Sequence, residues 1–598
     1  MTQHTKNWLM AVALSLIFIG AYDHYYLQPQ VEKQHKLAEQ QQREAKLPKL
    51  GAPAKSGASA PAGAAAAAVV KSREAALAES PRIAIDTRSL KGSIALKGAR
   101  IDDLSLKHYR ETVDPNSPII VLLSPENTDQ PYFADWGFLS AQVENAPALP
   151  DTDTLWTADR QKLTAGEPVT LTWDNGQGLA FKRKISLDDE YMFTIEDSVE
   201  NHGEKPAELF SFSRVTRVGQ PKSSGYAALH EGFIGMLGDG KSQEWKYDKV
   251  EKEPKGVEFK GVGGWVGFTD KYWGVVTAPD PNRAIEGWFR AEGGSVKTYV
   301  AEAYGEPVAV APNAAATNSL HVFAGAKEVD VLDAYEKSAG LKGFDRLIDW
   351  GWFYFITRPM FRLIDFLYKF LGNFGLAILA VTVIVKLAFL PIANASYKSM
   401  AKIKSIQPKI AALKEQYGDD KQKFNMEQME LYKREKVNPL GGCIPLLLQI
   451  PVFFSLYKVL VVTIEMRQAP FFGWIRDLSA PDPTNIFTAF GLIHWDPTKV
   501  ALFGPYLVLG IWPMLMGVTM WLQMKMNPEP TDEIQKSMFS WMPVIFTFTM
   551  GGFASGLVIY WTWNNLLSIT QQWIIYARAG QKFELWDNLR KTFGKVKA

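Results

Sequence analysis

Lys386 is the residue whose type and setting most clearly predict a function. It lies in the apolar stretch LAILAVTVIVKLAFLP, and Thr382 precedes it by about one helical turn on the same helical face. An ammonium group inside an apolar membrane span costs several kcal/mol unless it faces water or a partner. The alternative is that the long side chain reaches the cytoplasmic end of the span, about 9 Å away along the helix. Position alone leaves both interpretations open.

Five amide side chains add polar groups to similarly apolar surroundings. Each of them needs a satisfied hydrogen bond inside a membrane span. Together with Lys386 and Thr382 they predict a wet cavity among the helices, and ordinary hydrogen bonds between packed helices are the alternative for each. The five amides are Gln449, Asn564, Asn565, Gln571 and Gln572.

The sequence gives no support for catalytic or metal chemistry. It has no GxSxG nucleophile elbow, no HExxH zinc pattern and no pair of carboxylates within the apolar spans. Its single cysteine, Cys443, excludes both a disulfide scaffold and a thiolate zinc site. The net charge of +2 argues against nucleic acid as the main partner. We therefore predict that the protein is not an enzyme, holds no cofactor or metal and binds no nucleic acid by its sequence.

The first 80 residues predict a membrane anchor followed by a linker. Trp8 to Ala21 is an almost uninterrupted apolar run, and the tyrosines after it suit the membrane interface. A cleaved signal peptide is the alternative, but it would end in a small-x-small cleavage site. We expect a retained anchor over residues 1–27. Residues 28–80 are rich in Gln, Lys, Ala and Pro and predict a linker, because they cannot bury enough apolar surface to fold.

Residues 81–340 predict a large antiparallel β-domain. Short segments of alternating apolar and polar residues, such as Val169 to Trp173, are separated by Gly, Pro and Asn-Gly turns. Many such segments at short spacing are typical of a sandwich of two sheets.

Residues 341–370 predict an amphipathic helix that lies on the membrane surface. Apolar residues recur at helical spacing from Phe344 to Phe370, and Trp350, Trp352 and Tyr354 are of the types that settle at headgroup depth. A buried helix of a soluble domain is the alternative.

Five further apolar runs predict a helical core over residues 371–578. Each run except the fourth approaches the roughly 20 residues that cross a bilayer. The fourth rises only about 22 Å, against a hydrocarbon core of about 30 Å, and should tilt very little or thin the bilayer. With the anchor, the core makes six predicted transmembrane helices. The five runs are 371–392, 441–463, 502–524, 538–552 and 554–576.

The basic residues predict the orientation in the membrane, since Lys and Arg are held on the cytoplasmic side. The loop 396–437 carries ten of them and reads as a helical hairpin, whereas the loop 465–501 carries three. Counting helices from the hairpin puts both termini and the basic tail 579–598 in the cytoplasm and the β-domain outside. The hairpin is suited to lipid headgroups, nascent chains or ribosomal RNA.

One long segment, NPLGGCIPLLLQIPVFFSLYKVL at 438–460, closely resembles a transmembrane segment of the YidC insertases of Gram-negative bacteria. The resemblance continues in MAKIKSIQPKI, EMRQAPFFGWIRDLSAPDP and MPVIFTFTMGGFASGLVIYWTWNNLLSITQQWIIY, and it covers most of residues 345–580. It implies a multidomain membrane protein with an α-helical polytopic core and a large periplasmic all-β super-sandwich domain. The implied location is the bacterial inner membrane.

The same resemblance implies a membrane protein insertase and chaperone with a hydrophilic groove among its helices. Lys386 stands where the family often has Arg, and Ala554 stands where it commonly has Pro. The implied partners are nascent membrane proteins, the Sec translocon, the ribosome and membrane lipids. The implied groove residues are Thr382, Lys386, Gln449, Tyr560 and Trp561, and the implied hydrophobic slide consists of Ile450 and Phe453.

Two functions of other classes remain as alternatives. In a solute or ion transporter, Lys386 would bind the solute or relay protons, but no inverted repeat and no acidic pore lining accompany it. In a periplasmic binding protein the helices would serve only as an anchor, for which one helix suffices.

Overall fold

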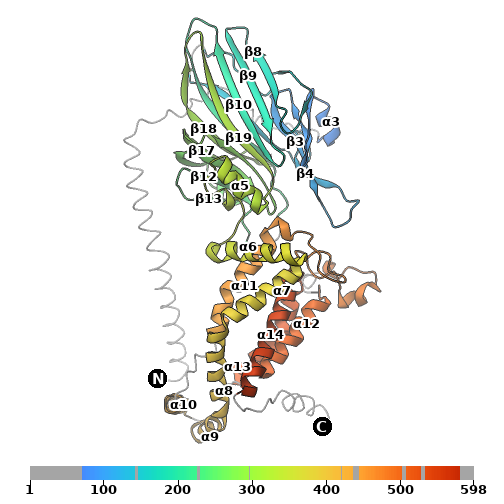
Figure 1. The fold of residues 1–598 in the computed structure, drawn as a ribbon, viewed down its shortest axis with the longest axis vertical. Coiled ribbons are helices and arrows are strands. Elements are labelled where there is room, and N and C mark those ends of the chain that lie inside the picture. Colours follow the sequence, from blue (N-terminus) through green and yellow to red (C-terminus); the bar gives the residue numbers. More distant parts are fainter. Residues whose placement is uncertain are drawn as a thin grey trace.

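The computed structural model describes residues 70–141, 146–224, 229–294, 296–418, 420–435, 444–500, 507–526 and 533–578. The predicted anchor, most of the linker, Cys443 and the basic tail lie outside the described residues. The described chain forms an elongated molecule with the β-domain at one end and the helices at the other (Figure 1).

The β-domain is a sandwich of a ten-stranded and a nine-stranded sheet. The strands of the larger sheet are β1 (Arg82–Asp86), β2 (Leu90–Ala95), β3 (Arg100–Arg110), β4 (Ile119–Leu123), β5 (Tyr132–Ser140), β7 (Lys162–Leu163), β11 (Ala207–Val218), β14 (Val257–Val262), β17 (Ala284–Glu292) and β18 (Thr298–Val310). Those of the smaller sheet are β6 (Thr157–Ala158), β8 (Val169–Asp174), β9 (Leu179–Leu187), β10 (Met192–Asn201), β12 (Gly232–Leu237), β13 (Gln243–Trp245), β15 (Gly264–Thr269), β16 (Trp273–Pro279) and β19 (Ala314–Ala326). Two short helices flank the strands, α3 (Arg73–Leu77) and α4 (Tyr247–Val250).

Alternation of side chains explains why these segments form a sandwich. In β9 the residues from Leu179 to Leu187 are buried at every second position, as expected of a strand with one face in the core. All described strand pairs are antiparallel except the short pair of β1 with β7. Four aromatic side chains with no exposed surface fill the space between the sheets: Phe233, Trp265, Phe268 and Phe289.

A short connection joins the sandwich to the helices. It contains α5 (Val329–Ser338), the 3-10 helix η2 (Phe344–Leu347) and α6 (Tyr354–Leu371). The amphipathic helix therefore begins ten residues later than the sequence pattern from Phe344 indicates. Gly343 and Gly351 have φ angles of 63° and 74°, which suit glycine and interrupt a regular helix.

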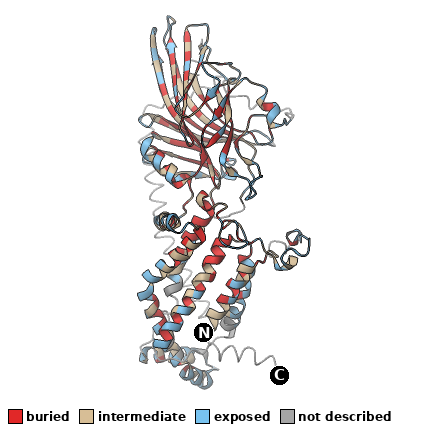
Figure 2. Cartoon of the chain, turned by 45° about the vertical axis from the view of Figure 1, so that its right-hand side comes forward, coloured by how far each residue is buried: buried red, intermediate tan, exposed pale blue. Residues whose placement is uncertain are grey.

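The remaining described helices form the other end of the molecule. They are α7 (Phe374–Ala388), α8 (Leu390–Ser405), α9 (Gln407–Tyr417), α10 (Lys421–Arg434), α11 (Ile444–Val462), α12 (Ile511–Met526), α13 (Glu533–Met550) and α14 (Ser555–Arg578), and the loop between α11 and α12 holds the 3-10 helices η4 (Ile464–Met466), η5 (Ile486–Gly491) and η6 (Pro497–Lys499). Figure 2 shows buried faces turned inward and exposed faces outward along the long helices.

None of the described helices is, by itself, both long and apolar enough to pass as a membrane span. A bent pair passes by length and composition: Phe374–Ala388 together with Leu390–Met400, at an angle of 67°. The apolar run expected at 371–392 is thus broken at Phe389, and Pro391 has no backbone N–H with which to continue the hydrogen bonds of α7. Helix α13 begins at Glu533 and is longer than the apolar run from Met538 that it contains.

The charged segment after α8 folds into two short helices, α9 and α10, at the end of the molecule farthest from the β-domain (Figure 1). They bury a small cluster of Ile406, Ile410 and Leu431. Asp420 caps α10 by accepting hydrogen bonds from the backbone N–H groups of Gln422 and Lys423.

Candidate functional site

Lys386 lies in the last turn of α7 and points toward α14. Its Nζ donates a hydrogen bond to Ser568 Oγ at 2.7 Å, and Ser568 Oγ donates to the backbone oxygen of Asn564 at 2.8 Å. Among the residues that the structure describes, Lys386 forms no ion pair. The half-buried ammonium group therefore has a hydroxyl partner and no neutralising carboxylate.

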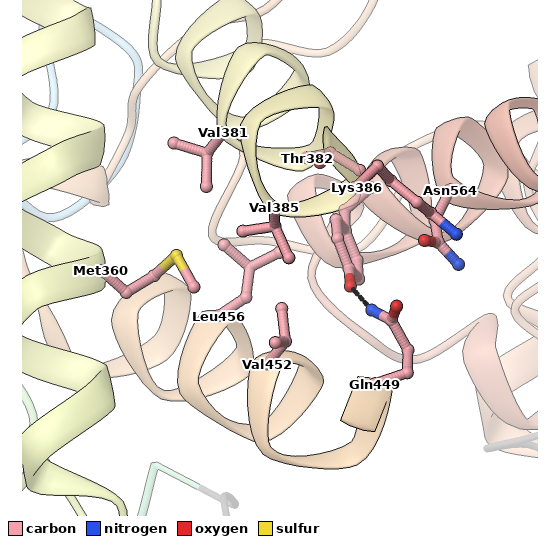
Figure 3. Close-up of a pocket in the computed structure, with 10 residues that line it drawn as sticks. Met360, Val381, Thr382, Val385, Lys386, Gln449, Val452, Leu456 and Asn564 are labelled. Atoms are coloured by element: carbon pink, nitrogen blue, oxygen red, sulfur yellow. Dashed lines mark hydrogen bonds between the residues drawn. The ribbon is translucent and has the colours of Figure 1, made fainter. Parts of the chain in front are cut away.

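Asn564 contributes a second polar group beside Lys386 (Figure 3). Its Oδ1 atom is buried and has no hydrogen-bond partner within the described part of the chain. A buried amide oxygen left in that state costs about 1–3 kcal/mol. A lysine and an unsatisfied amide in contact with one pocket are suited to water or to a polar segment of another molecule.

Gln449 and Tyr560 also line this pocket. Gln449 Nε2, on α11, donates a hydrogen bond to the hydroxyl of Tyr560 on α14 (Figure 3). Thr382 also lines the pocket, but its hydroxyl donates to the backbone oxygen of Ile378 at 2.7 Å. The Thr382 donor is therefore used within α7.

The pocket lies between α7, α11 and α14, with Met360 reaching it from α6. Apolar side chains make up half of its wall, and the free space holds about one water molecule. The pocket is therefore a small gap with a partly apolar wall rather than a channel. Its lining residues are Met360, Val381, Thr382, Val385, Lys386, Gln449, Val452, Leu456, Tyr560 and Asn564.

The other expected site residues lie outside the pocket wall. The rings of Phe453 and Trp561 meet edge to face with centroids 4.7 Å apart, and Trp561 also contacts Phe546 on α13. Ile450 is 42% exposed on the outer face of α11. The structure therefore brings together Lys386 and three expected groove residues, and separates them from a second, aromatic group.

Some of the five amides form ordinary hydrogen bonds within or between the helices, and others fit a polar cavity. Asn565 Nδ2 donates to Thr519 Oγ1 on α12 at 3.2 Å, which is an ordinary bond between packed helices. Gln572 Nε2 donates to Tyr576 one turn further on at 3.1 Å. Gln571 Nε2, like Asn564 Oδ1, is buried without a partner within the described residues.

Ser568 is the functional neighbour that sequence reasoning missed. It is buried and receives the hydrogen bond from Lys386. A signal was present, because Asn564, Ser568 and Gln572 follow each other at intervals of four and so share one helical face. A single serine is a weak signal, whereas a row of polar residues along one face of an apolar helix indicates a polar surface there.

The segment GMLGDGKS, Gly235 to Ser242, matches the letters of the phosphate-binding pattern GxxxxGK[ST]. A phosphate loop of that type leads from a strand into a helix, whose N-terminal N–H groups hold the phosphate. Here β12 turns directly into its antiparallel partner β13. The match therefore has no structural support, and the described residues contain no cluster of potential metal ligands either.

Comparison with known proteins identifies the family. The model of the YidC periplasmic domain matches residues 82–363, and that of the 60Kd inner membrane protein matches residues 366–582. A membrane protein insertase YidC from Beijerinckia indica subsp. indica is 55% identical over 605 residues, covering 100% of this chain and 99% of the relative. The chain belongs to the YidC family of membrane protein insertases.

A second relative agrees with this assignment. The YidC insertase of Methylobacterium sp. (strain 4-46) is 52% identical over 621 residues, with 98% of this chain and 97% of the relative covered. A solved structure titled "Active YidC insertase crystal structure with the first transmembrane domain resolved" matches 82% of this chain and 92% of its own, at 18% identity and a TM-score of 0.35. As a YidC protein, the chain is a bacterial inner-membrane protein with a periplasmic β-sandwich domain, and it is not an enzyme.

Ala554 stands where the resemblance to the family leads us to expect proline. Ala554 is buried just before α14. Ser555 N and Ser555 Oγ both donate to the backbone oxygen of Ala480, at 2.7 and 2.5 Å. These bonds to the loop after α11 fix the beginning of α14 without a proline.

Proposed function

We propose that this protein inserts other membrane proteins by giving their polar segments a path beside Lys386. The observation that carries the proposal is the Lys386 ammonium group, which lies between α7, α11 and α14 and whose only partner among the described residues is a hydroxyl. An acidic tail of a nascent membrane protein would supply the missing negative charge. A charged residue at the bilayer centre otherwise costs about 2.5 to 3.5 kcal/mol.

The pocket must widen before a polypeptide can enter, because it holds about one water molecule. The hydrogen bond from Gln449 to Tyr560 joins α11 to α14 across it. We infer that a substrate replaces this bond as α11 moves away from α14. A hydrogen bond of this kind contributes about 1 kcal/mol, so polar groups of the substrate can offset its loss.

Apolar substrate segments would leave past Ile450, Phe453 and Trp561 into lipid. Large apolar side chains stay exposed on the outer faces of the helices, as expected where lipid covers them. Partition of the apolar segment into lipid then drives the step without a nucleotide. Examples of these exposed side chains are Leu387, Leu447, Val518, Trp541 and Ile545.

The same reasoning supports a placement in the membrane. We propose six transmembrane helices, formed by the anchor at 1–27 and by α7, α11, α12, α13 and α14. Both termini and the α9–α10 hairpin are then cytoplasmic, and α6 lies on the outer surface. Trp352 and Phe370 of the α6 region, 89% and 83% exposed, support contact with headgroups.

The hairpin is the surface that we propose for cytoplasmic partners. Basic side chains such as Lys409 and Arg434 are exposed on it, although each also pairs with a glutamate. A basic, exposed hairpin suits lipid headgroups and ribosomal RNA. Cooperation with the Sec translocon is part of the proposal through family membership alone.

Site-specific photocrosslinking in native membranes tests this function. A photoreactive residue replaces Lys386, Thr382 or Trp561, and a ribosome-bound nascent membrane protein is the probe. Positions Trp541 and Val121 serve as controls on the outer helix surface and on the β-domain, because both are exposed. We expect crosslinks from the first three positions. Crosslinks from Val121 alone would contradict the proposal and favour a periplasmic binding protein.

A further inference from the structure

The end of α11 is joined to the β-domain by several polar contacts. Lys458 forms an ion pair with Asp349 at 2.7 Å, and Asp349 also accepts a hydrogen bond from the backbone N–H of His230 at 2.8 Å. Arg467 donates to the backbone oxygen of Arg110 on β3. Helix α11 thus has one end fixed to the β-domain, while Gln449 in its other half faces the pocket.

Glu465 makes the most unusual of these contacts. It lies in η4, directly after α11, and its Oε1 accepts a hydrogen bond from the backbone N–H of Val329 at 2.8 Å. Val329 is the first residue of α5, whose N-cap residue Glu328 makes no capping bond of its own. A residue 136 positions away in the sequence therefore caps the last helix of the β-domain. A helix N-terminus favours an acceptor of this kind because its first N–H groups lack partners.

The surroundings of Glu465 are acidic and enclosed. Its second oxygen, Oε2, is buried and has no partner among the described residues. The carboxylates of Glu328, before α5, and Asp365, on α6, are close enough to repel its charge, and Tyr109 on β3 also interacts with it. Glu328 is held by the hydroxyls of Tyr109 and Tyr191, and Asp365 is paired with Lys369 at 2.7 Å.

We propose that Glu465 is a positioning residue: by capping α5 it holds α11 against the β-domain and so keeps Gln449 within hydrogen-bond distance of Tyr560. Buried apolar side chains form one continuous cluster from the sheets through Trp350 to Leu460 and Tyr560, so a displacement at η4 is transmitted along packed side chains. The inference rests on the proposed function only for the meaning given to the pocket, and the docking itself is tested without any insertion assay.

Burial and the neighbouring carboxylates raise the pKa of Glu465 from 4.5 to about 7. The neutral acid still accepts the bond from Val329, and it removes the repulsion from Glu328 and Asp365. The docked state therefore binds a proton more tightly than an undocked one. Its added stability is complete below pH 4.5 and is lost as the pH rises to about 7.

Distances between spin labels test the docking directly. The full-length protein carries Cys443→Ser, Lys337→Cys on α5 and Leu447→Cys on α11, both of the latter at exposed positions. We expect one narrow distance for the parent and for Glu465→Gln, which keeps an acceptor and resembles the neutral acid. Glu465→Ala should lose the narrow peak. Arg362→Ala is the matched control, because it removes exposed ion pairs between α6 and α5 but leaves the cap.

The pH separates positioning from general stability. The parent distribution should be broader at pH 8 than at pH 5, and that of Glu465→Gln should not change. A narrow peak in Glu465→Ala identical to the parent, or equal pH responses in the parent and Glu465→Gln, would overturn the inference. A failure of the protein to insert substrates would contradict the proposed function and leave these distances as they are.

Discussion

Cations withdrawn from solvent, Arg183 fully and Lys386 in part, occur in the β-domain and the helical core, and their surroundings differ. Arg183 on β9 is 3% exposed, forms two hydrogen bonds of 2.8 Å with Asp197, and donates to the backbone oxygens of Ala99 and Trp136. The rings of Trp136 and Trp156 lie over its guanidinium group, each 4.9 Å away. Lys386 instead has a hydroxyl partner and borders a small pocket.

The difference separates a cation that stabilises a fold from one that is ready to bind. The donors of Arg183 are used within the β-domain, so removing its partner should unfold structure. The Lys386 ammonium group can still donate hydrogen bonds to another molecule, so its replacement should change function while the fold survives.

Asp197→Ala should lower the free energy of unfolding by about 4 kcal/mol, because it leaves the Arg183 charge buried and unpaired. Thermal unfolding of the full-length protein measures the loss. The matched control is Glu196→Ala. Glu196 directly precedes Asp197 on β10, and its ion pair with Lys184 is about half exposed. That control should cost roughly 0.5 kcal/mol or less. Equal losses from the two substitutions would refute the special role of the Arg183 site.

Lys386→Glu should reduce insertion of a substrate with an acidic tail roughly tenfold, or about 1.4 kcal/mol. Lys386→Arg should retain activity because the positive charge remains. Insertion into inverted membrane vesicles measures both, with a neutral-tailed substrate as control. If Lys386→Glu inserted the acidic-tailed substrate as well as the parent does, the electrostatic part of the mechanism would be wrong.

Asn564 and Asn565 form a neighbouring pair with opposite expectations. Asn565→Leu removes the bond to Thr519 and should cost about 1 kcal/mol of stability. Asn564→Leu removes an oxygen that has no partner within the described residues, so stability should hold while insertion of polar tails falls. Melting curves measure the stability of both variants, and insertion assays measure their activity. A stability loss confined to Asn564→Leu would mean that Asn564, and not Asn565, is the structural residue.

Arg362→Ala should have the smallest effect, roughly 0.5 kcal/mol of unfolding free energy, although its side chain pairs with both Asp330 and Asp333. Its guanidinium side chain is 39% exposed, so water replaces much of what is lost. Thermal unfolding compares the loss of unfolding free energy in Arg362→Ala with that in Arg183→Ala. A cost as large as that of Arg183→Ala would mean that exposure is not what distinguishes the two arginines.

Sequence reasoning anticipated the division into a β-sandwich and a helical part, because alternation along strands such as β9 and long apolar runs are local properties of the chain. It also selected Lys386, Thr382, Gln449 and Tyr560, which line one pocket. It could not give the capping of α5 by Glu465 or the hydrogen bond from Lys386 to Ser568. Those contacts join residues up to 182 positions apart and depend on how the elements pack.

The accessibility of position 386 to water shows whether Lys386 faces a polar path. In a Cys443→Ser background, Lys386→Cys is treated with a membrane-impermeant maleimide from the cytoplasmic side of native membranes, beside Ile384→Cys on the exposed outer face of α7. We expect rapid labelling at position 386 and slow labelling at position 384, because only position 386 faces a polar path. Labelling at 384 but not at 386 would contradict it and make Lys386 a structural lysine.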